Sequence, residues 1–255
     1  MIKFFRKIRY NLMEQNKTGK YLKYAIGEIA LVVIGILIAL SINNWNEGNK
    51  RTAQEVKILK EIISELETAV DDIESDLKDH HRNLNSSKIV RDVILYKKKQ
   101  NDTLNIHFLY AIDDETFTTK ESAFESLQSM GLDIISNDSI RQEITTVYMR
   151  IKKHANRESA SNKFAEALED KLETYIAIDR ERLVSGADSP DGEYWGRHLP
   201  FRFTNYEVLL NDETFLFNLM NSIDAKIAQI TVFRYFKNGI EALISDIDQE
   251  LIRLE

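Results

Sequence analysis

The sequence predicts an all-α protein in which one transmembrane helix is followed by an extended helical-bundle or coiled-coil domain. Two observations lead to this prediction. The stretch from Tyr24 to Ile42 reads YAIGEIALVVIGILIALSI and contains a single charged residue, Glu28. Beyond it, glycine and proline are absent between Gly48 and Gly131 and again between Gly131 and Gly186. Such runs without helix breakers favour helices.

Residues 1–20 form a basic segment ahead of the apolar stretch. Ile2, Phe5, Ile8 and Leu12 fall on one helical face, and basic residues surround the other. This pattern is typical of a short interfacial helix that lies on an anionic cytoplasmic leaflet. A frayed basic tail that only sets the topology is the alternative.

Residues 21–43 are predicted to span the membrane. At about 1.5 Å per residue, a helix over this range reaches roughly 33 Å, enough for a hydrocarbon core of about 30 Å. Tyr21, Tyr24 and Trp45 are placed like aromatic belts at its two ends. Ala39-Leu40-Ser41 satisfies a small-x-small cleavage rule, but the long basic region before the apolar core favours an uncleaved anchor over a signal peptide.

Charge sets the expected orientation. The whole chain has a formal charge of −7; residues 1–42 carry +5, so residues 43–255 carry −12. The positive-inside rule keeps the basic N-terminus in the cytoplasm, which places residues 44–255 outside it. An acidic domain is a poor nucleic-acid binder. The chain has no cysteine, so disulfides and thiolate metal sites are excluded.

Glu28 is the one ionisable residue within the predicted span, where a charge is costly and is by default a functional hypothesis. Gly27, Gly35 and Ala39 stand at multiples of four on the same helix, a small-residue stripe that would let another helix approach closely. These four residues are the candidate membrane-helix contacts. The alternative is that the Glu28 side chain reaches or pairs at the headgroup level.

The start of the domain is predicted to contain a helical seam. After a polar hinge at Asn43 to Gly48, apolar residues alternate at spacings of three and four, which is typical of a coiled coil or helix bundle. The seam residues are Val56, Leu59, Ile63, Leu66, Val70, Ile73 and Leu77. The pattern breaks at residues 83–87 and resumes up to the basic cluster Lys97 to Lys99, which suits a helix C-terminus.

Further helices are predicted along the chain. Residues 103–112 are expected to form a buried helix, with a strand as the less favoured alternative. Thr118, Thr119 and Ser122 are expected to open a helix that runs through Met130 and stops at Gly131. A helix capped by Asn137 or Asp138 is expected to continue to Leu183. Asn211 or Asp212 is expected to cap the last helix, whose seam residues are Phe215, Leu219, Ile223, Ile227, Ile230, Phe233, Ile240, Leu243, Ile247 and Leu251.

Gly186 to Asn205 is the one long predicted loop and holds both prolines of the chain. Loops carry function, and aromatic residues beside arginine make binding hot spots. The candidate partner or ligand contacts in it are Tyr194, Trp195, Arg197, His198, Phe201 and Phe203. A loop pinned over the bundle by its own aromatic residues explains the same composition at least as well.

Two blocks of the sequence resemble a known family. They are MIKFFRKIRYNLMEQNKTGKYLKYAIGEIALVVIGILIALSINNWNE at the N-terminus and AFESLQSMGLDIISNDSIRQEITTVY in the centre. The family is an uncharacterised bacterial one of membrane-anchored proteins, known only as a domain of unknown function. The resemblance implies an anchor in the bacterial inner membrane and a helical periplasmic domain. It implies no activity, cofactor or catalytic residue.

The sequence offers little chemistry. It lacks HExxH, GxSxG, Walker A and GxGxxG motifs. His80 and His81 with Asp76 and Asp79 could supply ligands to one ion, but an exposed polar helix end is the commoner explanation, so no metal or cofactor is predicted.

The favoured function is therefore an interaction or scaffold protein and not an enzyme. The expected partners are membrane lipids together with further copies of the chain or other envelope proteins. A sensor-like module that binds a ligand and signals through a partner is the alternative. An enzyme of unrecognised type ranks third.

Overall fold

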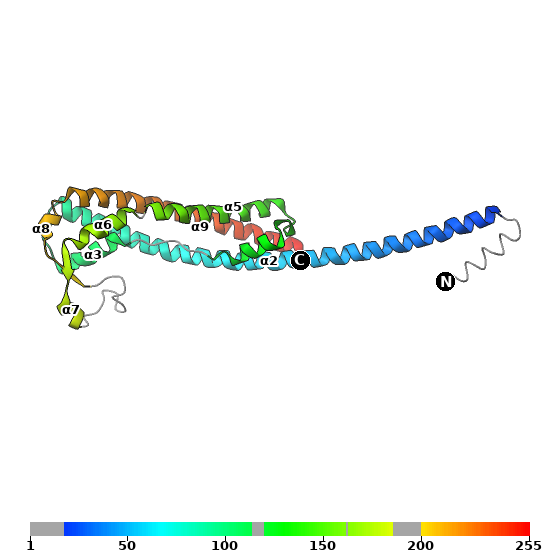
Figure 1. The fold of residues 1–255 in the computed structure, drawn as a ribbon, viewed down its shortest axis with the longest axis horizontal. Helices are drawn as coiled ribbons and strands as arrows, with labels where there is room; N and C mark the ends of the chain where they lie inside the picture. The colour runs from blue at the N-terminus through cyan, green and yellow to red at the C-terminus, as the bar shows by residue number, and fades with distance from the viewer. Residues whose placement is uncertain (1–17, 114–119, 162, 186–199) are drawn as a thin grey trace. The chain divides into compact units, whose positions relative to one another are not determined.

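The computed structural model describes residues 18–113, 120–161, 163–185 and 200–255. These residues are almost entirely helical (Figure 1), which confirms the predicted fold class. The predicted interfacial helix falls mainly on residues 1–17, which lie outside the described part. In chain order the elements are α2 (Thr18–Leu95), α3 (Asp102–Ile112), α4 (Ser122–Met130), η1 (Leu132–Ile134), α5 (Asp138–Ser161), α6 (Lys163–Glu173), β1 (Ile176–Ile178), α7 (Arg180–Ser185), β2 (Phe201–Phe203), α8 (Tyr206–Leu209) and α9 (Glu213–Leu254).

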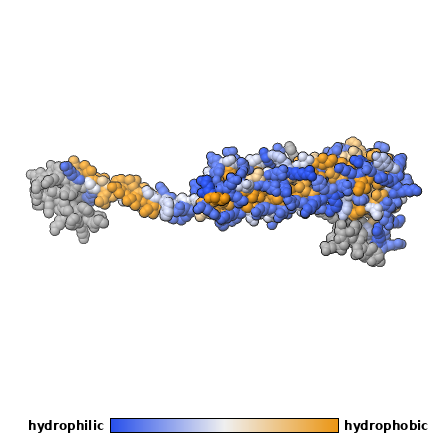
Figure 2. Space-filling view, turned by 180° about the vertical axis from the view of Figure 1, so that it is seen from behind, coloured by the Kyte–Doolittle hydropathy of each residue, from blue (hydrophilic) through white to orange (hydrophobic). Residues whose placement is uncertain are grey.

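The chain divides into two compact units, residues 1–57 and 58–255. The described part of the first unit is the N-terminal portion of α2. Its apolar side chains are exposed, including Leu31 at 66% and Ile38 at 56%, and they form a continuous hydrophobic band (Figure 2). Among the described residues, α2 is the one helix long and apolar enough to cross a membrane.

α2 is a single uninterrupted helix, so the predicted hinge at residues 43–48 and the predicted break at residues 83–87 are wrong. Local side-chain bonds make both polar stretches compatible with a helix. Lys50 Nζ lies 3.1 Å from Glu47 Oε1 one turn away. The Ser87 hydroxyl donates to the Asn83 carbonyl at 2.8 Å. These bonds within the helix satisfy part of the polar side chains of each stretch.

Long helical segments build the second unit, in which α2, α5 and α9 run side by side (Figure 1). α9 is antiparallel to α2, because Lys60 Nζ contacts Glu255 Oε1 at 2.7 Å while Lys237 Nζ contacts Glu74 Oε1 at 2.6 Å. α9 is also antiparallel to α5, because Asn137 near the start of α5 bonds Glu250 and Arg150 farther along α5 bonds Tyr235.

The buried face of α2 differs from the predicted seam. Leu59, Leu66 and Ile73 are buried as expected. Val56, Ile63, Val70 and Leu77 are only half-buried, and Ile58, Ile62 and Ala69 are buried beside the three confirmed positions. The reason is that α2 has neighbours on more than one side, since α9 and α5 both bond to it. Its covered face is therefore displaced and wider than a single a/d seam.

Two of the short helices, α3 and α4, fall on predicted segments. α3 confirms the helix predicted for residues 103–112. α4 ends at Met130, as predicted from Gly131, whose φ of +95° favours glycine. A Cβ added to Gly131 would also lie only 2.8 Å from Asp133 Oδ1.

The predicted helix reaching Leu183 is partly wrong, because Ile176 begins a strand. β1 pairs antiparallel with β2, with Ile176 opposite Phe203 and Ile178 opposite Phe201. β-branched and aromatic residues favour a pleated, half-buried strand. The partner strand lies about 25 residues further along the chain, so the local helical spacing of residues 168–176 gave no sign of this pairing.

α9 confirms the last predicted helix, and Asp212 is its N-cap. Nine of the predicted seam residues are buried, but Ile227 is 44% exposed. The neighbouring Lys226 is buried in its place, with 3% exposure. A charged residue thus occupies an interior position that the apolar pattern had assigned to isoleucine.

Candidate functional site

Glu65 on α2 is the centre of a buried polar junction between three helices. Glu65 is 8% exposed, and its carboxylate accepts three hydrogen bonds. Oε2 accepts from the Ser122 hydroxyl and from the backbone N–H of Ala123, both at 2.9 Å. Oε1 accepts from the Tyr148 hydroxyl at 2.6 Å. One side chain therefore joins α2 to the first turn of α4 and to the middle of α5.

The junction caps α4 from a distance. Glu121, the residue at the N-cap position of α4, makes no side-chain capping bond. Glu65 replaces that cap, and its negative charge is favourable at the positive end of the α4 dipole. Sequence patterns reveal caps that lie within a few residues, whereas this one is 58 residues away from Ala123.

Tyr148 completes the junction. Burial, and then the hydrogen bond to Glu65, raise the pKa of Tyr148 far above its usual value. The hydroxyl therefore stays protonated and acts as a donor. The Tyr148 ring stacks on Phe124 of α4, with the centroids 4.4 Å apart and the planes 3° from parallel.

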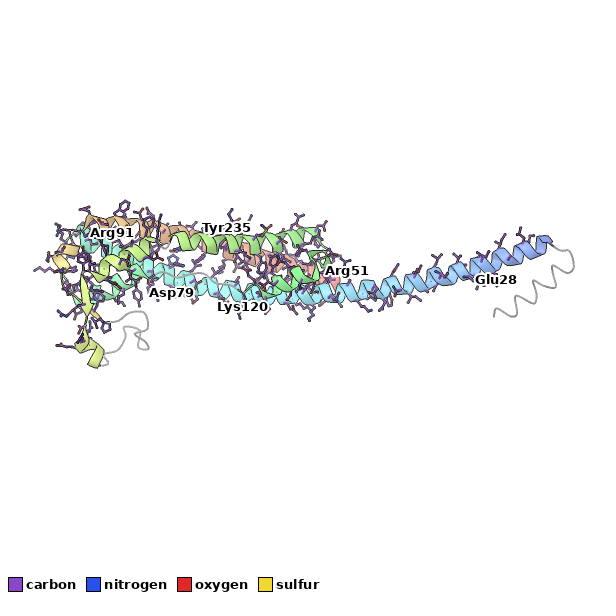
Figure 3. All side chains as sticks on the ribbon, viewed as in Figure 1. Glu28, Arg51, Asp79, Arg91, Lys120 and Tyr235 are labelled. Carbon is purple, nitrogen blue, oxygen red and sulfur yellow. The ribbon has the colours of Figure 1, made fainter. Side chains whose placement is uncertain are left out.

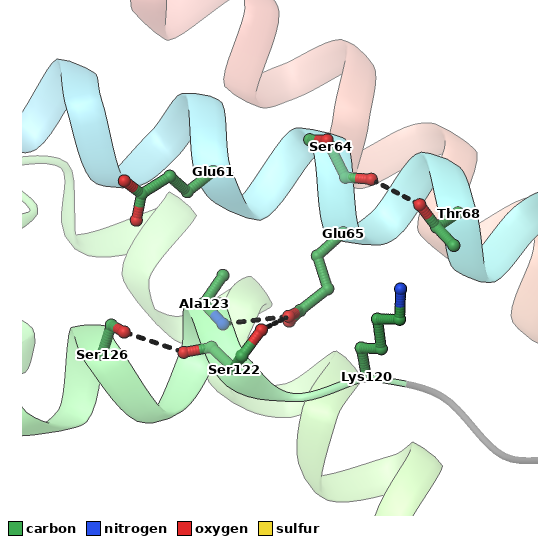
Figure 4. A pocket seen from close by; sticks show the side chains of 8 residues that line it. All are labelled: Glu61, Ser64, Glu65, Thr68, Lys120, Ser122, Ala123 and Ser126. Atoms are coloured by element: carbon green, nitrogen blue, oxygen red, sulfur yellow. Dashed lines mark hydrogen bonds between the residues drawn. The ribbon is translucent and has the colours of Figure 1, made fainter.

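A polar groove of about 370 Å³ borders this junction between α2 and α4 (Figure 4). It presents hydroxyl groups and charged groups and has no large apolar side chain. Thr68 and Ser126 donate their hydroxyl protons to backbone carbonyls one turn earlier, which leaves their oxygens as acceptors. The lining residues are Glu61, Ser64, Glu65, Thr68, Lys120, Ser122, Ala123 and Ser126. Such a groove could hold a small polar molecule.

A second polar cluster lies inside the bundle, where α2 meets α3 and α9. His80, Asn83, Ser86 and Ser87 of α2 are all at most 2% exposed. They fall between apolar parts of the same buried face, so the core of the bundle contains a polar layer. The Ser86 hydroxyl lies 3.1 Å from His107 Nδ1 of α3, and burial lowers the pKa of His107. Asn83 Nδ2 has no hydrogen-bond partner among the described residues.

Lys226 of α9 places a buried positive charge at the C-terminal end of α3. Its Nζ donates to the Ala111 carbonyl at 3.2 Å and to the Ser222 hydroxyl at 2.9 Å. Ala111 lies in the last turn of α3, where carbonyl groups lack helical partners and a cation is favourable. Lys226 and Glu65 play similar roles at separate places. Each is a buried charged residue on a long helix, and each offsets the dipole at one end of a short helix.

Asp212 links α9 to α6. It accepts from the N–H groups of Thr214 and Phe215, from Lys171 Nζ at 3.1 Å and from the Tyr175 hydroxyl at 2.6 Å. Burial by itself would raise the pKa of Asp212, but these hydrogen bonds, led by that of Tyr175, outweigh it and lower the pKa to about 2.

A family model matches residues 28–177, which is 150 of the 255 residues. The chain belongs to DUF6090, a family of unknown function. No curated protein and no solved structure gives a significant match. The DUF6090 range includes Glu65, α4 and Tyr148, so the whole Glu65 junction lies within it. It ends inside β1 and leaves α9, with Lys226 and Asp212, outside.

The predicted membrane contacts lie on the exposed portion of α2. Gly27, Gly35 and Ala39 are exposed and Glu28 is half-exposed, and Glu28 lies on this portion of the helix (Figure 3). A Cβ added at Gly27 or Gly35 would meet no atom within 4 Å. The described residues therefore leave that helix surface open. The contact itself stays a prediction.

The predicted loop contacts are only partly described. Tyr194, Trp195, Arg197 and His198 lie outside the described residues. Phe201 and Phe203 belong to β2. Phe201 is buried, and the half-buried Phe203 has its ring centroid 5.0 Å from that of Phe108 and 5.0 Å from that of Tyr206. Both phenylalanines thus help to hold the small sheet against α3 and α8.

His80 and His81, which were considered as metal ligands, lie in different environments. The His80 ring is buried, with its centroid 5.0 Å from that of Phe233. His81 is exposed, and its Nε2 lies 3.0 Å from an Arg234 guanidinium nitrogen. Because arginine only donates, this His81 nitrogen acts as the acceptor. Within the described residues, no group of three or more His, Cys, Asp or Glu is arranged to hold a metal ion.

Proposed function

We propose that this member of DUF6090 is a single-pass membrane protein whose helical domain, residues 44–255, acts as an interaction or scaffold module outside the cytoplasm. The observation that supports this most directly is α2, which contains an exposed apolar stretch and also supplies core residues of the helical domain. Exposing so many large apolar side chains to water is costly, and a lipid bilayer removes that cost.

The proposed orientation has the N-terminus in the cytoplasm of a bacterial cell and the domain in the periplasm. Its support is the basic excess before the span. Fusing a reporter that is active only in the cytoplasm to Glu255 should give no signal. A matched fusion at Lys20 should give a strong one. Strong activity from the Glu255 fusion would contradict the proposed orientation.

The interaction role is supported by how the domain is built. Glu65, Lys226 and Asp212 each tie neighbouring helices together through buried or half-buried charges, which suits a domain that presents fixed surfaces. The proposed partners are a second copy of the chain, other envelope proteins, or both. Mass measurement of the full chain purified in mild detergent should show a bound protein or a second copy.

A ligand-binding, sensor-like role is the second candidate, favoured by the polar groove beside Glu65. The same mass measurement distinguishes the two. A small molecule that is retained by the parent and lost on Thr68→Trp, which fills the groove, would favour the sensor. A bound protein that is retained in both would favour the interaction module.

A further inference from the structure

We propose that α4 is a releasable cover over Glu65 and Tyr148. When α4 is docked, the Glu65 carboxylate and the Tyr148 ring are buried; when it is released, both become accessible on neighbouring helices. This inference concerns a conformational change within the domain and holds independently of the proposed membrane topology.

The first argument is that α4 is too short to be a stable helix without its docking contacts. It has nine residues, and helices shorter than about 12 residues are marginal in water even with favourable sequences. Only Ala123, Phe124 and Leu127 are buried, and the other six residues of α4 are exposed. The helix therefore depends on its docking contacts.

The second argument is that the hydrogen bonds and the ring stacking that dock α4 are concentrated at its first turn. Glu65 supplies the cap that α4 lacks, and the Phe124 ring stacks on Tyr148 close by. By contrast, α9 is capped by its own Asp212, and α5 is capped by Asn137, which accepts from the N–H groups of Ser139 and Ile140. Losing the Glu65 carboxylate should therefore loosen α4 and leave those helices in place.

The third argument is access from solvent. The polar groove reaches the Glu65 junction from one side, and Glu65, Ser122 and Ala123 form part of its wall (Figure 4). Water can approach the hydrogen bonds that hold the first turn of α4. Polar groups at such a site can exchange a protein partner for water at little cost, so local opening there is cheaper than in a dry core.

The test uses the absence of cysteine from the chain. Ala123→Cys places a thiol on the docked face of α4, where the residue is 7% exposed, and Ala165→Cys places one on α6, where it is 6% exposed. Both full-length variants are reacted with an excess of a thiol reagent in detergent. Ala123→Cys should react about tenfold faster than Ala165→Cys, because α6, although it is also short, bonds to Asp212 through Lys171 and buries Leu168 and Leu172 in the main hydrophobic core.

Adding Glu65→Gln should accelerate the reaction of Ala123→Cys by a further factor of about ten, because a charge-assisted cap is weakened. It should leave the reaction of Ala165→Cys unchanged. The matched control Glu67→Gln, at an exposed position of the same helix outside the groove, should change neither rate.

Equal rates for the two cysteines in the parent background, or no response of Ala123→Cys to Glu65→Gln, would overturn the proposal. An equal acceleration of both cysteines would also overturn it, since the whole bundle would then be opening. If Ala123→Cys does not fold, hydrogen exchange of the unmodified chain decides: α4 amides should exchange before those of α5 and α9, and simultaneous exchange would refute the cover.

Discussion

Asp212 is the residue whose ionisation should influence stability most clearly. Its pKa is about 2 in the folded protein against 3.8 for the ordinary side chain. Because the folded pKa is lower, Asp212 stabilises the fold above pH 4, and this contribution is lost as the pH falls from about 4 to about 2. The shift corresponds to about 2 kcal/mol at neutral pH.

We therefore predict that Asp212→Asn lowers the free energy of unfolding by about 2 kcal/mol at pH 7, and that the difference from the parent shrinks towards pH 2. Denaturant unfolding of the full chain in detergent, followed by circular dichroism at several pH values, measures this. Asp248→Asn, at an exposed position on the same helix, is the control and should have little effect. Curves for parent and Asp212→Asn that stay equally separated down to pH 2 would contradict the prediction.

At the scale of the element, the displaced buried face of α2 can be tested with one adjacent pair. Ile62 is fully buried and Ile63 only half-buried. Ile62→Ala should lower the free energy of unfolding by about 2–5 kcal/mol, and Ile63→Ala by about half of that or less. The two variants make the same chemical change on the same turn, so each controls for the other in the same unfolding measurement. Equal losses would show that Ile63 contributes as a core residue, as the predicted seam requires.

Local sequence signals identified most of the helices. Gly131, Asn137 and Asp212 act within a few residues of the helix ends that they define, so the ends they set were predictable. The predicted apolar face of α9 was also largely confirmed, because the alternation of apolar residues depends only on helical geometry and burial.

Features that depend on distant partners were not predictable. β1 exists because β2 pairs with it, and residues 168–176 alone continue a helical pattern. No local pattern marks Glu65, and only the fold brings Ser122 and Tyr148 to it. Lys226 was overlooked because Ile227 beside it fits the apolar spacing. Lys226 itself stands three residues after Ile223 and four before Ile230, so its spacing is a weak sequence signal of a place on the buried face.

At the scale of the whole molecule, the proposed self-association makes a testable claim about Gly35. We predict that Gly35→Leu reduces the mass of the full chain in detergent from that of an oligomer to that of a single copy, because a bulky side chain prevents close helix approach. Ile36→Leu, at the next position, should leave the mass unchanged. A parent protein with the mass of one copy would remove the basis of the prediction, and an oligomer that persists in Gly35→Leu would place the contact elsewhere.

The ion pair between Lys60 and Glu255 joins residues 195 positions apart, and this separation sets an order of events during synthesis. α2 is complete once residue 95 has been made, but the helix that covers its buried face ends at residue 254. At about 5–20 residues per second, the apolar side chains of Ile58 to Ile94 wait roughly 8–30 s for their last partners. The buried face of α2 is thus made well before α9, and it lacks this partner until the last turns of α9 have been synthesised.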